Sequence, residues 1–367
     1  MSLSRREFVR AAGAGLLLRS QFLKSQATTG SKAVAIQPSA PRAKVALVHG
    51  DDRRKNVHDA LAGVDEQIRA GLARKKYVVI KPNNVSSENQ LASTNADAIR
   101  GILDYLEPRF RGPVVIAEAA AGDTLEGFEN FKYPQLAAER RAQKVSLVDL
   151  NREGKYETAY LIDYDLHVTP VRLAARLFDP DAYIISSAML KTHNTVVATM
   201  SVKNMVLGSP LHSVPGEPRW SDKRKFHVGI RQIQLNMLAT AQKLQPNWGV
   251  AVIDGFEGME GNGPGGGTAV ASHIAIASTD FVAADRVGLA AMGINPDWVG
   301  YLNFCGQVGV GQFDLAKIEI AGASIASVEK KYKLHDDIEQ ELQWMGPMNE
   351  LPDRVGRLST EQEIYFG

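Results

Sequence analysis

The sequence predicts an α/β fold of mostly parallel strands, in one sheet or two lobes, with helices on both faces. From Lys44 onward, short apolar runs rich in β-branched residues alternate with longer amphipathic segments. Continuous apolar strands of this kind are typical of a parallel sheet that helices cover on both sides. Hydrophobic residues make up 44% and charged residues 23% of the 367 residues, values typical of a soluble globular protein.

Eight segments fit the strand pattern, and five amphipathic segments between them fit the helix pattern. The predicted strands are residues 44–49, 77–82, 113–119, 145–150, 182–186, 249–254, 273–278 and 317–322. The predicted helices are residues 57–72, 96–106, 135–142, 228–244 and 281–292. In folds of this class, ligands bind beyond the carboxyl ends of the strands, so polar residues at those ends are the candidates for a site.

The first 27 residues have the features of an export signal. A basic start is followed by the apolar residues 11–18 and then by small residues. Arg5 and Arg6, followed by Phe8, resemble the twin-arginine (Tat) signal, which a receptor reads and which does not anchor the protein. We therefore expect the Tat machinery to export the chain to the periplasm or the outside of the cell. The alternative is an ordinary basic terminus.

The chain divides into four predicted segments. Residues 1–27 form the signal and residues 28–43 a small, polar, Pro-containing linker. Residues 44–322 form the α/β domain, and residues 323–367 form a charged tail, without a clear strand, that wraps the surface. An apolar stretch of eight residues is too short to cross a bilayer, which needs about 20, so we expect no transmembrane span in the mature chain. The pattern gives no prediction of the oligomeric state.

Charge and cysteine content exclude two classes of protein. The formal charge is +1, but residues 1–27 contribute +4, which leaves −3 for the rest. The remainder therefore has no overall positive field to attract nucleic acid. The single cysteine, Cys305, excludes an iron–sulfur cluster held by four cysteines of the chain, and its apolar, Gly-rich surroundings predict a buried side chain.

Two of the predicted strands end in charged or amide side chains. Lys81 lies at the end of the strand at 77–82 and Asn83 comes two residues later, and Glu118 lies at the end of the strand at 113–119. Because the carboxyl ends of parallel strands lie at one edge of a sheet, we expect these groups to meet. Lys81 would bind a phosphate or carboxylate there. The alternative is a lysine whose aliphatic stem packs past the sheet edge.

The segment after the strand at 182–186 is basic and contains no acid. No Asp or Glu occurs between residues 182 and 216, yet this stretch carries Lys191, His193, Lys203 and Asn204. We interpret it as the wall of a site for a small anionic ligand. His193 would be a general acid or base, or a metal ligand, or else a hydrogen-bonded structural histidine. We expect the acids that balance these lysines to come from the second half of the chain.

Acidic and amide groups gather in a Gly-rich segment, residues 254–267. Asp254, Glu257 and Glu260 are spaced by three, and Asn262 follows. Carboxylate oxygens of this kind can bind a divalent metal such as Mg²⁺ or Ca²⁺, and one of them can serve as a general acid or base. Alternatively, they cap turns and pair with the lysines.

Two further aspartates lie near the start of the helix predicted at 281–292. Asp280 is explained by N-capping of that helix. Asp285 lies among alanines and valines, and a buried acid needs a partner, for which Lys81, Lys191 and Lys203 are the candidates.

The order of these motifs resembles the domain-of-unknown-function family 362 (DUF362). The resemblance rests on VVIKPN, IAEA, KTH with SVKNMVLG, VIDGFEGMEGNGPGGG and ASTDFVAADRVGLAAMG, and runs from about residue 44 to 322. Many relatives carry ferredoxin-like cysteine motifs and look like redox proteins, a pattern from which this chain departs with its one cysteine. The resemblance implies an α/β domain whose polar motifs line one site: Lys81, Asn83, Glu118, Lys191, His193, Lys203, Asn204, Asp254, Glu260, Asn262, Asp280 and Asp285.

These observations predict an exported enzyme that acts on a small molecule bearing a phosphate or carboxylate, with or without a divalent metal. The lysines, with Asn83 and Asn204, would bind the anion. His193, Lys191 and Glu260 would be catalytic. Asp254 and Glu257 would bind the metal together with Glu260. The alternatives are an exported anion- or metal-binding protein without catalysis, and a protein in which these charges only neutralise one another.

Overall fold

The computed structural model describes residues 41–346. The predicted signal, most of the predicted linker and the last part of the tail lie outside these residues. Among the described residues, the helices are all too short or too polar to cross a membrane.

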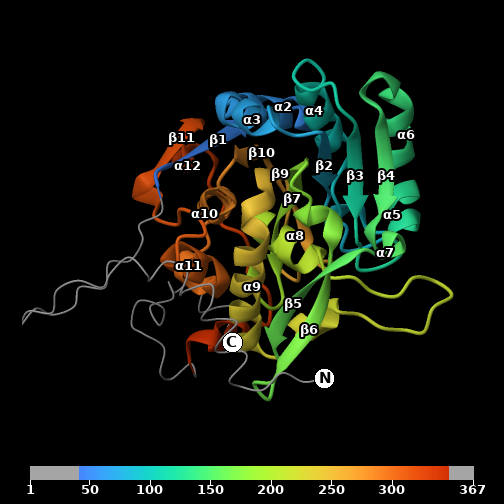
Figure 1. The fold of residues 1–367 in the computed structure, drawn as a ribbon. Coiled ribbons are helices and arrows are strands. Elements are labelled where there is room, and N and C mark those ends of the chain that lie inside the picture. Colours follow the sequence, from blue (N-terminus) through green and yellow to red (C-terminus); the bar gives the residue numbers. More distant parts are fainter. Residues whose placement is uncertain (1–40, 347–367) are drawn as a thin grey trace, which may run out of the picture.

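A nine-stranded mixed sheet forms the centre of the molecule (Figure 1) and confirms the predicted α/β class. Its order is β11 (Ile318–Gly322), β1 (Ala43–His49), β10 (Thr268–Ser278), β9 (Trp248–Glu260), β7 (Ala182–His193), β2 (Tyr77–Lys81), β3 (Val114–Glu118) and β4 (Val145–Asp149). The short β8 (Val197–Thr199) pairs with β7. Along this order every neighbouring pair is parallel except the two that involve β10.

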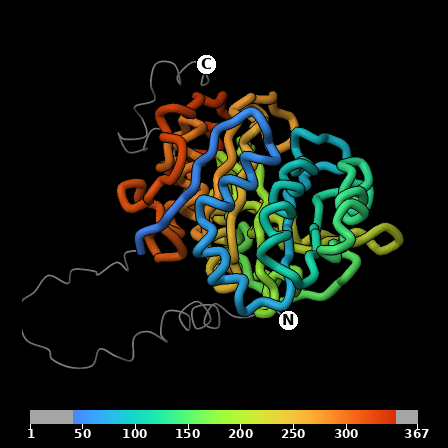
Figure 2. Tube along the Cα trace, turned by 90° about the horizontal axis from the view of Figure 1, so that it is seen from above, coloured from blue at the N-terminus to red at the C-terminus, as the bar shows by residue number. Residues whose placement is uncertain are grey.

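Helices cover both faces of the sheet, as the continuous apolar strands predict. Alternate strand residues enter two separate cores, for example Val79 and Val115 in one and Ile80 and Ile116 in the other. One face carries α2 (Arg53–Ala62), α3 (Asp65–Leu72), α4 (Ala96–Leu106), α5 (Thr124–Asn130) and α6 (Tyr133–Glu139). The other carries α8 (Ser201–Gly208), α9 (Ile230–Leu244), α10 (Phe281–Ala291) and α11 (Gly300–Gln307). Seen from above, the blue and cyan helices and the orange and red helices lie on different sides of the strands (Figure 2).

All eight predicted strands are present, and β7, β9 and β10 run further than predicted. The helix predicted at 57–72 is two helices, because α2 ends at Ala62, with Gly63 as its C-cap, and α3 begins at Asp65. The antiparallel hairpin of β5 (Tyr156–Ile162) and β6 (Val168–Ala174) was not predicted. Its strands alternate polar and apolar residues at the surface and therefore lack the continuous apolar runs on which the prediction relied. The short helices α7 (Leu150–Glu153), α12 (Ile325–Val328) and α13 (Ile338–Leu342) complete the described elements.

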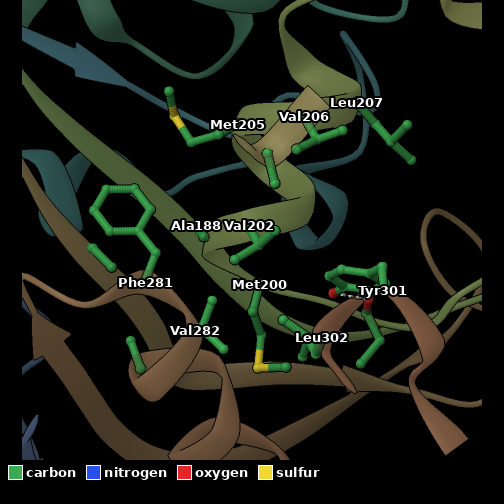
Figure 3. Close-up of a cluster of buried hydrophobic side chains, with 14 of the residues drawn as sticks. Ala188, Met200, Val202, Met205, Val206, Leu207, Phe281, Val282, Tyr301 and Leu302 are labelled. Atoms are coloured by element: carbon green, nitrogen blue, oxygen red, sulfur yellow. Dashed lines mark hydrogen bonds between the residues drawn. The ribbon is translucent and has the colours of Figure 1, made fainter. Parts of the chain in front are cut away.

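Helix α8 is a buried helix between the sheet and the second helical layer. Val202, Met205 and Val206 form the i, i+3, i+4 stripe that packs beside Phe281 and Val282 of α10 (Figure 3). Full burial of side chains of this size stabilises the fold by about 1.5–3 kcal/mol each. This packing fixes the position of the remaining faces of α8.

The order of the strands places a switch point between β2 and β7. From β2 the chain moves outward through β3 to β4, and it then returns to place β7 on the other side of β2. The connections after β2 and β7 therefore diverge and leave a crevice at the carboxyl ends of these two strands.

The described part of the tail, residues 324–346, lies partly in the core. It has no strand, as predicted. Tyr332, Leu334, Ile338 and Leu342 are each at most 3% exposed, so this segment does more than wrap the surface.

Candidate functional site

A cleft of about 320 Å³ lies at the switch point, and we call it the switch-point cleft. Four cationic side chains and one carboxylate line it. The excess is three positive charges when the four cations are protonated and the carboxylate is ionised. The cations are Lys81, Lys203, Lys223 and Arg224, and the carboxylate is Glu118. Asn83, Asn84, His193, His227 and the backbone around Gly208 also border the cleft.

Lys81 and Glu118 form a buried ion pair at the ends of β2 and β3. The Lys81 ammonium donates to Glu118 Oε1 over 2.7 Å, and both side chains are at most 2% exposed. The backbone amides of Ala119 and Asn84 donate to the same carboxylate. Burial lowers the pKa of Lys81, while Glu118 acts in the opposite direction. The acid that balances Lys81 therefore comes from the first half of the chain, which corrects the expectation that it lies in the second half.

Asn204 of α8 connects this ion pair to the neighbouring strands. Its Oδ1 accepts from Lys81 Nζ at 3.1 Å and from Asn83 Nδ2 at 3.2 Å. Its Nδ2 donates to the backbone oxygen of Lys81 and to Ser186 Oγ. Both ends of the amide are thus satisfied, and Asn83 and Asn204 help to position Lys81.

Gly208 allows this arrangement because it has no side chain. A Cβ atom at this position would lie 2.8 Å from Lys81 Cε and closer still to its ammonium group. Contacts this short are not found for real side chains, so any larger residue would displace Lys81 from Glu118.

Lys203, also on α8, lines the same cleft but has no partner. Its side chain is buried, with 6% exposure. Within residues 41–346, no hydrogen bond or ion pair engages its ammonium group. Burial and the nearby charge of Lys81 lower the pKa of Lys203 to about 8, with Glu118 acting in the opposite direction. The ammonium group opens to the cleft, so a molecule in the cleft is the partner available to it.

His193 ends β7 and borders the cleft with 3% exposure. Burial and the charge of Lys203 hold its pKa well below the usual range, so the ring is neutral near pH 7. Its Nδ1 accepts a hydrogen bond from the Thr195 amide at 3.2 Å. The neutral ring therefore carries its proton on Nε2 and is a hydrogen-bond donor at that atom. Service as a general base through Nε2 would require loss of the Thr195 bond, so the geometry favours the donor role over the predicted acid–base role.

Lys191 does not line the cleft. Its side chain is fully buried, and its ammonium donates to the backbone oxygen of Ala92 over 2.7 Å. Burial and the charge of Lys203 lower its pKa well below the usual value. Lys191 is thus buried outside the cleft lining and is not in the predicted position within the site.

Two cations of the cleft were missed by sequence reasoning. Lys223 and Arg224 begin the short 3₁₀ turn Lys223–Phe226, in the long loop between α8 and α9 that projects from the body in Figure 1. Burial in the cleft, with repulsion from Lys81 and Lys203, lowers the pKa of Lys223 to about 7. The run DKRK in this loop was the available signal, but a basic run in a polar loop is equally typical of an exposed surface.

The carboxylates of the Gly-rich segment are not brought together. Asp254, Glu257 and Glu260 belong to β9 and not to a loop, and the outer two are six positions apart along the strand, or about 20 Å. Arg53 binds Asp254 at 3.1 Å and approaches Glu257 at 3.7 Å. Glu260 accepts from the Lys333 amide. Among residues 41–346, no group of three or more His, Cys, Asp or Glu side chains is arranged to hold a metal. The structure thus leaves the three side chains spread along β9, each with its own partner.

Glu260 and Asn262 form hydrogen bonds with the C-terminal segment and do not line the cleft. Asn262 Nδ2 donates to Asp336 over 2.7 Å, and Asn262 Oδ1 accepts from the Asp336 amide. Together with the bond from Lys333 to Glu260, these contacts fix the chain near residues 333–336. The catalytic role predicted for Glu260 has no support from its position.

Asp280 and Asp285 lie away from the cleft as well. Asp280 follows β10, which is antiparallel to its neighbours, so it emerges at the opposite edge of the sheet. It caps α10 through the Ala283 amide, as predicted. The partners of Asp285 are the backbone amides of Ser201 and Val202 at the start of α8, not a lysine. Burial raises the pKa of Asp285 to about 7.

Comparison with known proteins gives a family but no activity. The model of the domain of unknown function DUF362 matches residues 78–290, which include β3, β7, α8, all of β2 but its first residue and the whole switch-point cleft. No curated protein shows significant similarity to the chain. A crystal structure of a protein from Thermotoga maritima matches with a TM-score of 0.37 and 14% identity, over 56% of this chain and 51% of that one. The chain thus spans about half the length of that protein.

Proposed function

The chain belongs to the DUF362 family, whose description names no activity, and from the geometry of the cleft we propose that it binds a small molecule bearing a carboxylate or phosphate. The observation that carries this proposal is Lys203, a lysine of 6% exposure that lines the switch-point cleft without a partner among the described residues. A bound anion would supply the missing counter-charge.

The surroundings of Lys203 favour a small oxyanion over other ligands. Lys223 and Arg224 add positive charge to the same cleft, and Arg presents the donor fork that matches carboxylate or phosphate oxygens. The neutral ring of His193 offers a further donor at Nε2. A volume of about 320 Å³ is at the low end for ligand pockets, which suits a small molecule.

The proposal retains the anion ligand of both predicted functions, the enzyme and the binding protein, and omits the metal. The carboxylates assigned to a metal have other partners, namely Arg53 for Asp254 and Glu257, and the Lys333 amide for Glu260. We include export by the twin-arginine route in the proposal, on the basis of Arg5 and Arg6 alone.

Thermal unfolding with added anions tests this proposal. Inorganic phosphate and succinate, each titrated at low ionic strength, should raise the Tm of the wild-type protein in proportion to the logarithm of their concentration above Kd. The Lys203→Met variant should lose most of this rise. Lys76→Met is the matched control, because Lys76 is an exposed lysine paired with Asp181 at the opposite edge of the sheet.

Two results would contradict the proposal. One is an unchanged Tm of the wild-type protein with both anions. The other is an equal rise in the wild-type protein and in Lys203→Met, which would place the binding elsewhere.

A further inference from the structure

Lys203 differs from the other buried lysines nearby in that its amine is free to react. The Lys81 ammonium is engaged by Glu118 at 2.7 Å, and the Lys191 ammonium by the backbone oxygen of Ala92, also at 2.7 Å. The Lys203 nitrogen has no such contact among the described residues, and it borders an open cleft. Lys223 also lines the cleft, but its nitrogen lies 3.4 Å from the backbone oxygen of Leu207, so Lys203 is the cleft lysine whose nitrogen has no contact with a described group.

The helix that carries Lys203 fixes its position. Lys203 is the third residue of α8, and the adjacent Val202, Met205 and Val206 are buried in the core (Figure 3). A side chain placed by a packed helix is better oriented for a reaction than one on a mobile loop. The first turn of a helix also has a positive potential, which disfavours protonation of an amine nearby.

The surroundings maintain part of Lys203 in the uncharged form that is nucleophilic. With a pKa of about 8, about one tenth of the side chain is an uncharged amine at pH 7, and about half is at pH 8. Burial beside another cation is an established way to activate a lysine for attack on a carbonyl group.

We propose that Lys203 forms an imine with the carbonyl carbon of a small anionic carbonyl compound, of the class of 2-oxo acids, bound in the switch-point cleft. This inference rests on the proposed anion binding and adds a covalent step to it. Lys223 and Arg224 would bind the acid group of the compound, while Lys203 reacts with the carbonyl carbon through its uncharged fraction instead of serving as the counter-ion. The uncharged amine attacks the carbonyl carbon to form the C–N bond, the two amine hydrogens leave with the carbonyl oxygen as water, and a C=N bond remains. No oxidant or reductant is needed. The Nε2–H group of His193 is available to donate a hydrogen bond to the carbonyl oxygen, without transfer of its proton.

Reductive trapping with pyruvate tests this step. Borohydride adds hydride to the C=N bond and converts a transient imine into a stable N-carboxyethyl lysine, which peptide mass spectrometry locates. We expect the adduct on Lys203 of the full-length protein, at more than ten times the level on exposed lysines such as Lys76. Lys203→Arg removes the primary amine and should abolish the adduct on this peptide, whereas Lys76→Arg should leave the Lys203 adduct unchanged.

The outcomes separate the two proposals. If succinate and pyruvate raise the Tm of the wild-type protein but no adduct forms on Lys203, imine formation is refuted and anion binding stands. An adduct spread evenly over exposed lysines also refutes it, because this is the pattern of non-specific amine chemistry. If neither the Tm shift nor the adduct is seen, both proposals fail.

Discussion

Replacement of Lys203 by methionine should stabilise the protein while it removes anion binding. Methionine keeps the length of the side chain and its apolar contacts but removes the buried charge. The pKa of Lys203 is about 8 in the folded protein against an ordinary value of 10.5, so the charged side chain destabilises the folded state by about 3 kcal/mol at pH 7. Water in the cleft makes this an upper value.

The pH dependence gives a signature that packing alone would not produce. The folded protein releases this proton at a lower pH than the unfolded chain. The free energy of unfolding of the wild-type protein therefore rises relative to that of Lys203→Met between pH 8 and 10.5. The advantage of the variant should be largest at pH 7 and should fall below about 1 kcal/mol at pH 10.

Urea unfolding, followed by tryptophan fluorescence at pH 7 and pH 10, measures this difference. Lys76→Met is the control, because Lys76 is exposed and Asp181 raises its pKa instead of lowering it. The reasoning would be refuted by a Lys203→Met variant that is less stable than the wild-type protein at pH 7, or by an advantage that does not change with pH.

Three other changes have expected outcomes. Gly208→Ala would place a methyl group against the end of Lys81. We expect it to lower the free energy of unfolding by about 1–3 kcal/mol and to weaken phosphate binding. Unchanged urea unfolding curves would contradict the assigned contact. Glu118→Gln leaves the buried Lys81 ammonium without its counter-ion. Urea unfolding should show that the free energy of unfolding falls by about 3 kcal/mol or more. A fall of less than about 1 kcal/mol would mean that the pair is not buried as described. Lys–Lys in place of Arg5 and Arg6 should leave the chain in the cytoplasm, as cell fractionation would show, whereas continued export would exclude the twin-arginine route.

The sequence was sufficient for the strands and for the centre of the site because both depend on local patterns. Apolar runs located every strand of the main sheet except the short β8, and polar residues at the ends of β2, β3 and β7 identified Lys81, Glu118 and His193. The acid-free segment pointed to Lys203 and Asn204, which the structure places in or beside the same cleft.

The errors have two physical causes. The direction of a strand is not encoded in its own pattern, so the antiparallel β10 carried Asp280 to the opposite edge of the sheet. The continuation of β9 through a Gly-rich segment likewise separated Asp254 from Glu260. The second cause is that the path of a side chain is set by its neighbours in space, which placed Lys191 outside the cleft lining, on Ala92.

Proton uptake on anion binding tests the central claim most directly. At pH 7.5, pKa values of about 8 for Lys203 and about 7 for Lys223 leave about one proton missing from the pair, and a bound anion favours the charged forms. Succinate does not itself titrate at this pH, so calorimetric titrations in buffers of different ionisation enthalpy count the protons taken up. We predict uptake approaching one proton per succinate in the wild-type protein and in the Lys76→Met control. Binding without proton uptake, or with proton release, would contradict the claim that these lysines receive the anion.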